Sequence, residues 1–229
     1  MAAILLIETS TALCSVALEK DGEIISSRHS DVARPHASLT AVFCDEVLRE
    51  AGLTAKNLDA VCISEGPGSY TGLRVGLSTA KGLCFGAGIR LLSVCSLDVL
   101  AEMALQRSCG AGWIVPMIDA RRMEVYTAVY DGSAVRTTPV EAKVIDGQSF
   151  SDIAVEAVFI GDGAMKCKDT IGCGTFVEAC PEADAMAPLA EKEYAAGNFR
   201  DVAYFEPFYL KDFVVTASRK TLLPKGNQD

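Results

Sequence analysis

Short apolar runs separated by turn signals open the chain and predict strands. Residues 4–7 are continuously apolar, and residues 14–18 alternate between apolar and small or polar side chains, as in a strand with one buried face. Asp21 and Gly22 form a hairpin signal, so residues 23–26 are expected to be the third strand. The pattern therefore predicts three antiparallel strands at the start of the fold.

Residues 35–51 have the apolar spacing of a helix. Leu39, Phe43 and Val47 recur at every fourth position and form one apolar row, and Gly52 follows where such a helix is expected to end. The pattern then predicts a buried strand at 58–63, a helix at 69–85, a strand at 91–94 and a helix at 96–106. This alternation of strands and helices is typical of an α/β fold.

The helix at 69–85 follows a glycine-rich turn and contains a stripe of small residues. Residues 66–68 (Gly-Pro-Gly) turn the chain sharply, because glycine takes positive φ without strain and proline fixes its own φ. Gly72, Gly76 and Ala80 then follow at every fourth position. An interior glycine costs a helix about 0.5–1 kcal/mol relative to alanine, so this stripe indicates that something approaches the backbone closely.

Three interpretations of this turn and helix compete. A helix N-terminus can bind phosphate, and Ser69 or Thr71 is expected to cap this one. The Walker pattern requires Gly-Lys-Ser/Thr, however, and Tyr70, Thr71 and Gly72 stand in that place, which excludes a P-loop. The helix either packs tightly on its own sheet or packs against a helix of a partner, and the glycines alone fit both.

The pattern of the first twenty residues returns about 110 residues later. The repeated units are an apolar strand at 114–119, a second strand at 125–130 and an Asp131-Gly132 turn. Aligning Glu8 with Asp119 places residues 15–18 against residues 126–129. Each half thus contains a strand, an acid at its end, a loop and a second strand.

Internal repetition of this kind predicts two related α/β lobes. The expected division is an N-terminal lobe of residues 1–108 and a C-terminal lobe of residues 109–229. The second lobe is expected to contain a strand at 158–160, a Gly-rich turn at 161–164 and a helix at 182–196. Pro188 should start or kink that helix and Gly197 should end it, while the tail after Lys220 is expected to fray.

Composition narrows the classes of function. The chain has 229 residues, a net charge of −9 and only 21 Lys and Arg, which makes it a poor stand-alone binder of nucleic acid. Its nine cysteines are scattered without CxxC pairs, so they are expected to be reduced core residues rather than a zinc site or a disulfide framework. With no long apolar span, the expectation is a soluble cytoplasmic protein without a membrane contact.

Motifs in both halves resemble the bacterial TsaB (YeaZ) family. The matching segments are Ile7-Glu-Thr-Ser-Thr11, Cys14-Ser-Val-Ala-Leu18, Gly66-Pro-Gly-Ser-Tyr-Thr-Gly-Leu-Arg-Val-Gly76, Lys81-Gly-Leu83, Asp119-Ala-Arg121 with Glu124-Val-Tyr126, and Pro207-x-Tyr209-Leu-Lys211. The resemblance implies a duplicated α/β fold of the actin/hexokinase/Hsp70-like (ribonuclease H-like) type. Glu8 stands where aspartate is common in the family.

The resemblance also implies a function. Members of this family support the synthesis of N6-threonylcarbamoyladenosine at position 37 of tRNA. The chain would be a non-catalytic subunit that binds the catalytic TsaD protein, with TsaE, an ATPase, joining the two. It would form a homodimer when alone and would meet tRNA only through the complex.

In that family the partner binds helices of the N-terminal lobe, here about 35–51 and 69–85. This raises the partner-helix interpretation of the glycine stripe above packing on the chain's own sheet. The residues expected at the partner interface are Leu39, Phe43, Val47, Ser69, Tyr70, Gly72, Leu73, Gly76 and Ala80.

Metal chemistry is not expected for this chain. Proteins that resemble TsaD hold a metal partly with a His-x-x-x-His pair on the first helix, and this chain has His36 followed by Thr40 there. One imidazole without a second makes a poor site for zinc or iron. We therefore expect no metal and no cofactor.

An ATP-dependent small-molecule kinase is the alternative function. Kinases of this fold use an acid after the first strand of each lobe to hold magnesium, with hydroxyls nearby for phosphate. Glu8, Thr9, Ser10 and Asp119 occupy those positions and would form a vestigial nucleotide site. Against a kinase, Arg121 and the arginine after it stand where small residues would admit phosphates. A homodimeric structural protein is a third interpretation.

Overall fold

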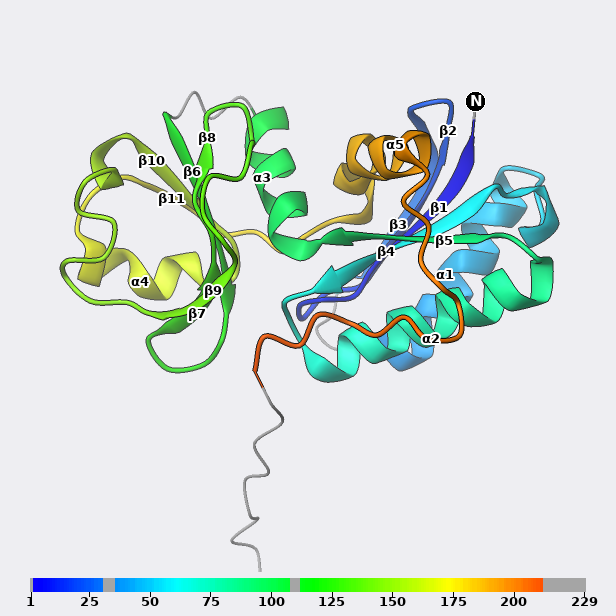
Figure 1. Ribbon diagram of the computed structural model, residues 1–229, viewed down its shortest axis with the longest axis horizontal. Helices are drawn as coiled ribbons and strands as arrows, with labels where there is room; N and C mark the ends of the chain where they lie inside the picture. The colour runs from blue at the N-terminus through cyan, green and yellow to red at the C-terminus, as the bar shows by residue number, and fades with distance from the viewer. Residues whose placement is uncertain (1, 31–35, 108–111, 212–229) are drawn as a thin grey trace, which may run out of the picture.

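The structure is a computed structural model that describes residues 2–30, 36–107 and 112–211, and it contains two lobes, each built on a mixed sheet (Figure 1). The first sheet consists of β1 (Ala3–Glu8), β2 (Ser15–Lys20), β3 (Glu23–His29), β4 (Ala60–Gly66) and β5 (Arg90–Cys95). Their order is β3-β2-β1-β4-β5, with β1, β2 and β3 antiparallel and β4 and β5 parallel to β1.

The second sheet repeats this topology. It consists of β6 (Trp113–Asp119), β7 (Glu124–Thr127), β8 (Tyr130–Asp131), β9 (Glu141–Val144), β10 (Ala157–Ile160) and β11 (Thr175–Val177). The order β11-β10-β6-β7-β9 mirrors the first sheet, again with an antiparallel hairpin on one side of the first strand and parallel strands on the other. The predicted duplicated two-lobe α/β fold is confirmed.

The repeat differs from the sequence alignment by one residue. Glu8 pairs with Ser15 across β1 and β2, whereas Asp119 pairs with Val125 across β6 and β7. The turn of the second lobe is thus one residue shorter, so Ser15 corresponds to Val125 and not to Tyr126. The strand predicted at 125–130 is also interrupted, because the chain leaves β7 and returns as β8 against the start of β6.

Helices cover both faces of the first sheet. α1 (His36–Glu50) and α2 (Tyr70–Ala87) lie on one face, while α3 (Ser96–Gln106) and α5 (Ala187–Ala196) lie on the other (Figure 1). α3 packs on β6 and β10 as well as on β4 and β5, so its apolar side chains join the cores of the two lobes. α4 (Ala164–Ile171) packs on the outer face of the second sheet, and 3-10 turns lie at Ala55–Asn57, Ala154–Glu156 and Ala183–Met186.

Several helices begin or end at the capping residues that the sequence indicates. Ser69 caps α2 by accepting a hydrogen bond from the Gly72 amide at 3.3 Å, as expected for one of the two candidate caps. The helix predicted at 182–196 begins as a 3-10 turn and becomes α5 at Ala187, with proline in the first turn and Gly197 at its end with φ 71°. The tail after Lys220 lies outside the described residues.

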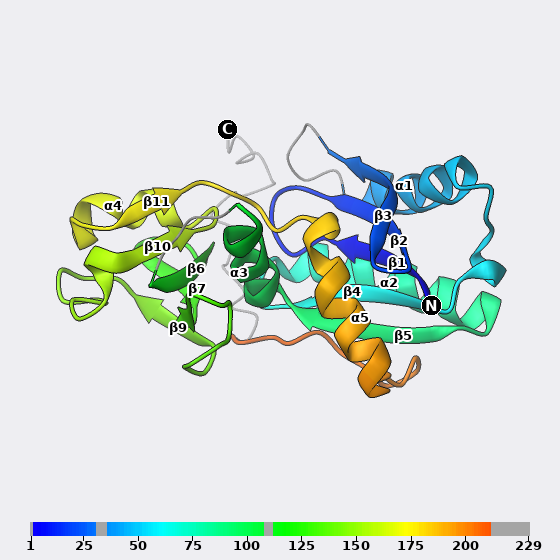
Figure 2. The ribbon, with the colours of Figure 1, turned by 90° about the horizontal axis from the view of Figure 1, so that it is seen from above.

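The division of the lobes differs from the expected boundary. Seen from above, α5 lies over the first sheet, and the chain after it runs along β5 and back toward the second lobe (Figure 2). Met186 is fully buried in a core with β5 residues, and the Arg200 amide donates to the Leu91 carbonyl at 2.8 Å. Residues 183–209 therefore pack on the N-terminal lobe, although they follow the second sheet in sequence.

Candidate functional site

The turn after β1 is the first place where the fold could hold a ligand. Glu8 ends the strand, is fully buried, and accepts a hydrogen bond from the Ser10 amide at 2.5 Å. Burial raises the pKa of Glu8 above its ordinary value, and the hydrogen bond from Ser10 offsets only part of that shift. Thr9 and Ser10 are buried as well, so this turn is part of the interior.

The glycine-rich segment covers this turn. The Ser69 amide donates to the Ser10 carbonyl at 2.6 Å. A Cβ at Gly68 or Gly72 would come closer than 3.0 Å to the carbonyl oxygens of Ser10 and Thr9, respectively. These glycines let the start of α2 lie directly on the backbone that follows β1.

The glycine stripe therefore faces the chain's own first lobe, which corrects its placement at a partner interface. A Cβ at Gly76 would meet the Thr9 hydroxyl closer than 3.0 Å, and Gly72 and Ala80 are buried too. The interpretation that the glycines permit tight packing on the chain's own sheet accounts for them. The sequence could not decide this, because a small-residue stripe has the same spacing whichever surface it approaches.

The second lobe holds its acid in the same way. Asp119 ends β6 and accepts a hydrogen bond from the Arg121 amide at 2.9 Å, two residues further on, as Glu8 does from Ser10. Unlike Glu8, the Asp119 side chain is exposed, and it forms an ion pair with Lys166 of α4. Each acid thus stabilises the turn that follows the first strand of its lobe.

The structure does not assemble Glu8 and Asp119 into a magnesium site. Glu8 is closed off in the first lobe, and Asp119 is neutralised by Lys166 on the surface of the second. Arg121 and Arg122 occupy left-handed backbone conformations in the loop that joins β6 to β7. Among the described residues, no group of three or more histidine, cysteine, aspartate or glutamate side chains is arranged to hold a metal ion.

The predicted interface residues on α1 and α2 differ in how exposed their side chains are. Val47 and Leu73 are buried in the first lobe, so they cannot contact a partner in this conformation. Leu39, Phe43 and Tyr70 are half-buried at the rim. Ser69 is exposed at the start of α2.

Two exposed apolar side chains on these helices were not predicted for the interface. Phe85 is 87% exposed near the end of α2, and Val42 is 46% exposed on α1. Beside Phe85 lies a cavity of about 390 Å³ between Gly82 and Gly86 of α2 and the 3-10 turn at Ala55–Asn57. Phe85 is the last residue of the helix predicted at 69–85, and the stripe of small residues in that helix does not indicate whether this ring is covered.

The two lobes, whose sheets have the same strand order, form the actin/hexokinase/Hsp70-like fold. At the level of the fold, the chain is similar to an activator of 2-hydroxyisocaproyl-CoA dehydratase from Clostridium difficile with bound ADPNP, with TM-score 0.51 at 9% identity. That likeness covers 87% of this chain and 98% of the other. Among the described residues, no helix is long and apolar enough to span a bilayer.

Relatives of higher similarity identify the family. Residues 23–215 match the family model described as TsaD, tRNA N6-adenosine threonylcarbamoyltransferase. The chain is 31% identical over 223 residues to the tRNA threonylcarbamoyladenosine biosynthesis protein TsaB of Escherichia coli K12, covering 92% of this chain and 95% of that protein. YeaZ from Pseudomonas aeruginosa superposes with TM-score 0.81 at 28% identity, covering 92% of this chain and 100% of the other. The chain therefore belongs to the TsaB (YeaZ) family.

Proposed function

We propose that this chain is a non-catalytic subunit in the synthesis of N6-threonylcarbamoyladenosine at position 37 of tRNA. It would act by binding and supporting a catalytic TsaD-like subunit. The similarity to TsaB proteins named for this biosynthesis, over nearly the whole length of both chains, supports the pathway. The match to the TsaD family model supports a partner of the same fold.

The closed turn after β1 is the observation that supports a non-catalytic role. Kinases of this fold need an accessible acid and hydroxyls in that turn to hold magnesium and phosphate. Here Glu8, Thr9 and Ser10 are buried, and α2 lies on them through Gly72 and Gly76. In this conformation the turn presents no accessible acid, which supports a non-catalytic role.

The partner surface that we propose is the exposed side of α1 and α2. It includes Leu39, Phe43, Ser69 and Tyr70 from the predicted set and adds Phe85. A large exposed aromatic side chain beside a groove is typical of an interaction surface. The same surface would support a homodimer when the partner is absent, and a TsaE-like ATPase and tRNA would join only once the TsaD-like subunit is bound.

Two measurements on the purified chain test this proposal. Size-exclusion chromatography with light scattering should show a stable complex with the TsaD-like protein of the same organism. An ATP-turnover assay with Mg²⁺ should show no activity of the chain alone, in wild type or in Glu8→Gln. Magnesium-dependent turnover that Glu8→Gln abolishes would establish the kinase alternative instead.

A further inference from the structure

Arg74 on α2 lies between two tyrosines that come from distant parts of the chain. Its guanidinium carbon lies 4.3 Å from the centre of the Tyr70 ring, one turn earlier on the helix, and 6.0 Å from the centre of the Tyr209 ring. Its Nε donates a hydrogen bond to the Tyr209 hydroxyl at 3.1 Å. The two rings themselves lie 4.9 Å apart, so the three side chains form one cluster.

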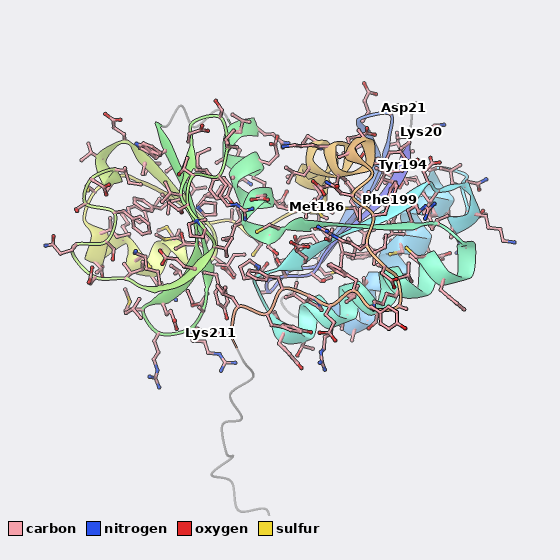
Figure 3. All side chains as sticks on the ribbon, in the orientation of Figure 1. Lys20, Asp21, Met186, Tyr194, Phe199 and Lys211 are labelled. Atoms are coloured by element: carbon pink, nitrogen blue, oxygen red, sulfur yellow. The ribbon has the colours of Figure 1, made fainter. Side chains whose placement is uncertain are left out.

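The segment that carries Tyr209 is attached to α2 and to the lobe junction along its length. Lys81 Nζ donates to the Ala203 carbonyl at 3.0 Å, and the Phe208 amide donates to the Glu65 carbonyl at 2.7 Å. Lys211 then pairs with Glu124 of the second lobe, at the lower side of the junction (Figure 3). These contacts hold the Tyr209 ring in place, so the position of the Arg74 guanidinium is set before any partner arrives.

Within the part of the chain that the structure describes, the terminal nitrogens of Arg74 are available for another anion. Among residues 2–30, 36–107 and 112–211, no carboxylate lies within 4.0 Å of this guanidinium, and Glu206 acts on it electrostatically from further away. Arg74 is exposed, unlike the buried glycines on the opposite side of the same helix. A planar guanidinium with its Nε already bonded presents its two remaining nitrogens as a fork that matches a carboxylate.

We propose that Arg74, held between Tyr70 and Tyr209, is a preformed binding site for a carboxylate side chain of the catalytic partner protein. This inference rests on the proposed function, because it names one contact on the surface assigned there to the TsaD-like subunit. Tyrosine and arginine are the residues that contribute most to binding at protein interfaces, and a preorganised pair loses less entropy when the partner binds.

The charge of the chain favours a protein carboxylate over a nucleic-acid phosphate. A chain of net charge −9 repels a polyanion, whereas a single carboxylate in a protein interface requires only one local cation. Lys81, two turns further along α2, is already bonded to the Ala203 carbonyl, and Lys211 is paired with Glu124. The cluster therefore offers one cationic fork rather than a row of cations along a phosphate backbone.

Titration calorimetry of the full chain with the TsaD-like protein of the same organism tests this site. The variants are Arg74→Lys, which keeps the charge but removes the fork, and Tyr209→Phe, which keeps the ring but removes the hydroxyl. The matched control is Arg90→Lys, because Arg90 also lies over an aromatic ring, that of Phe199, at 5.3 Å and outside the cluster. Thermal unfolding of each variant checks that the fold is retained.

We expect Arg74→Lys to weaken binding by about tenfold to hundredfold, as for the loss of a bidentate charged contact. Tyr209→Phe should weaken it by a few-fold, and Arg90→Lys should bind like wild type. Wild-type binding with unchanged affinity for Arg74→Lys would overturn the site and leave the proposed function standing. Unchanged affinity combined with loss of tRNA binding by the assembled complex would also overturn it and assign Arg74 to a phosphate. No binding by wild type would overturn both.

Discussion

At the scale of single residues, glycines on one helix have opposite surroundings. Gly72 lies on the backbone of the turn after β1, whereas Gly82 faces open space, with nothing within 4 Å of where a Cβ would be. The first glycine is required by a close approach, and the second only weakens the helix. Gly82 lies outside the stripe of Gly72, Gly76 and Ala80, and its spacing in the sequence does not show what surrounds it.

These surroundings predict opposite stability changes. Gly72→Ala should lower the free energy of unfolding by about 1–3 kcal/mol, because the new methyl group overlaps the Thr9 carbonyl. Gly82→Ala should raise it by about 0.5–1 kcal/mol, since alanine is the better helix former and meets nothing. Urea unfolding of both variants measures the difference. A Gly72→Ala protein as stable as wild type would contradict the packing of α2 on this turn.

A second residue-scale prediction concerns pH. Glu19 of β2 is buried, and burial together with the neighbouring Glu191 of α5 raises the pKa of Glu19 from 4.5 to about 8. A carboxyl with a raised folded-state pKa stabilises the fold below pH 4.5, and that contribution is lost as the pH rises toward 8. Wild type should therefore lose stability over this range.

Glu19→Gln should remove that pH dependence. The amide stays neutral, and its oxygen can still accept the hydrogen bond that the Gly22 amide donates to Glu19 at 3.3 Å. At pH 8 the variant should be more stable than wild type by on the order of 1–3 kcal/mol, with little difference at pH 5. Urea midpoints at both pH values measure this. Parallel profiles for the two proteins would show that Glu19 does not titrate as described.

At the scale of elements, the sequence predicted local structure well and long-range placement poorly. The helix predicted at 96–106 has those bounds, and Asp21 and Gly22 form the expected turn with φ of 59° and 86°. Both are determined by neighbouring residues. The stacking of Tyr209 on Tyr70 joins positions far apart in sequence, and no periodic pattern encodes such a contact.

The same limit explains the misplaced lobe boundary. The repeated strand pattern places the boundary near residue 108, but α5 and the 3-10 turn before it return to cover β5. Ala183, Met186 and Ala190 supply the apolar surface that this face of the first sheet lacks without them. A lobe boundary inferred from the order of elements along the chain cannot show that a later segment packs back on the first lobe.

A fragment experiment follows from this packing. Residues 1–107 alone should bind the dye ANS and unfold without a cooperative transition, because the face of β5 is uncovered. Co-expression with residues 178–211 should restore a cooperative thermal transition. Residues 112–177, which retain the second sheet and α4, serve as the comparison. A cooperative transition for residues 1–107 alone would contradict the assignment of α5 to the first lobe.

At the scale of the whole molecule, duplication has left two acid-capped turns in different states. Glu8 is enclosed by α2, and Asp119 is exposed but paired with Lys166. Among the described residues, neither turn is arranged as a magnesium site. The role that we propose for the chain is to hold a partner. The exposed sides of α1 and α2 and the Arg74 cluster are the surfaces on which that role would depend.

The most direct test of that role is tRNA modification in a reconstituted reaction. The TsaD-like and TsaE-like proteins of the same organism are supplied with tRNA, ATP, threonine, bicarbonate and the carbamoyl-adenylate synthase, with and without this chain. We predict N6-threonylcarbamoyladenosine only when the chain is present, and equally so with Glu8→Gln. The same yield of product without the chain would contradict its role as a required subunit.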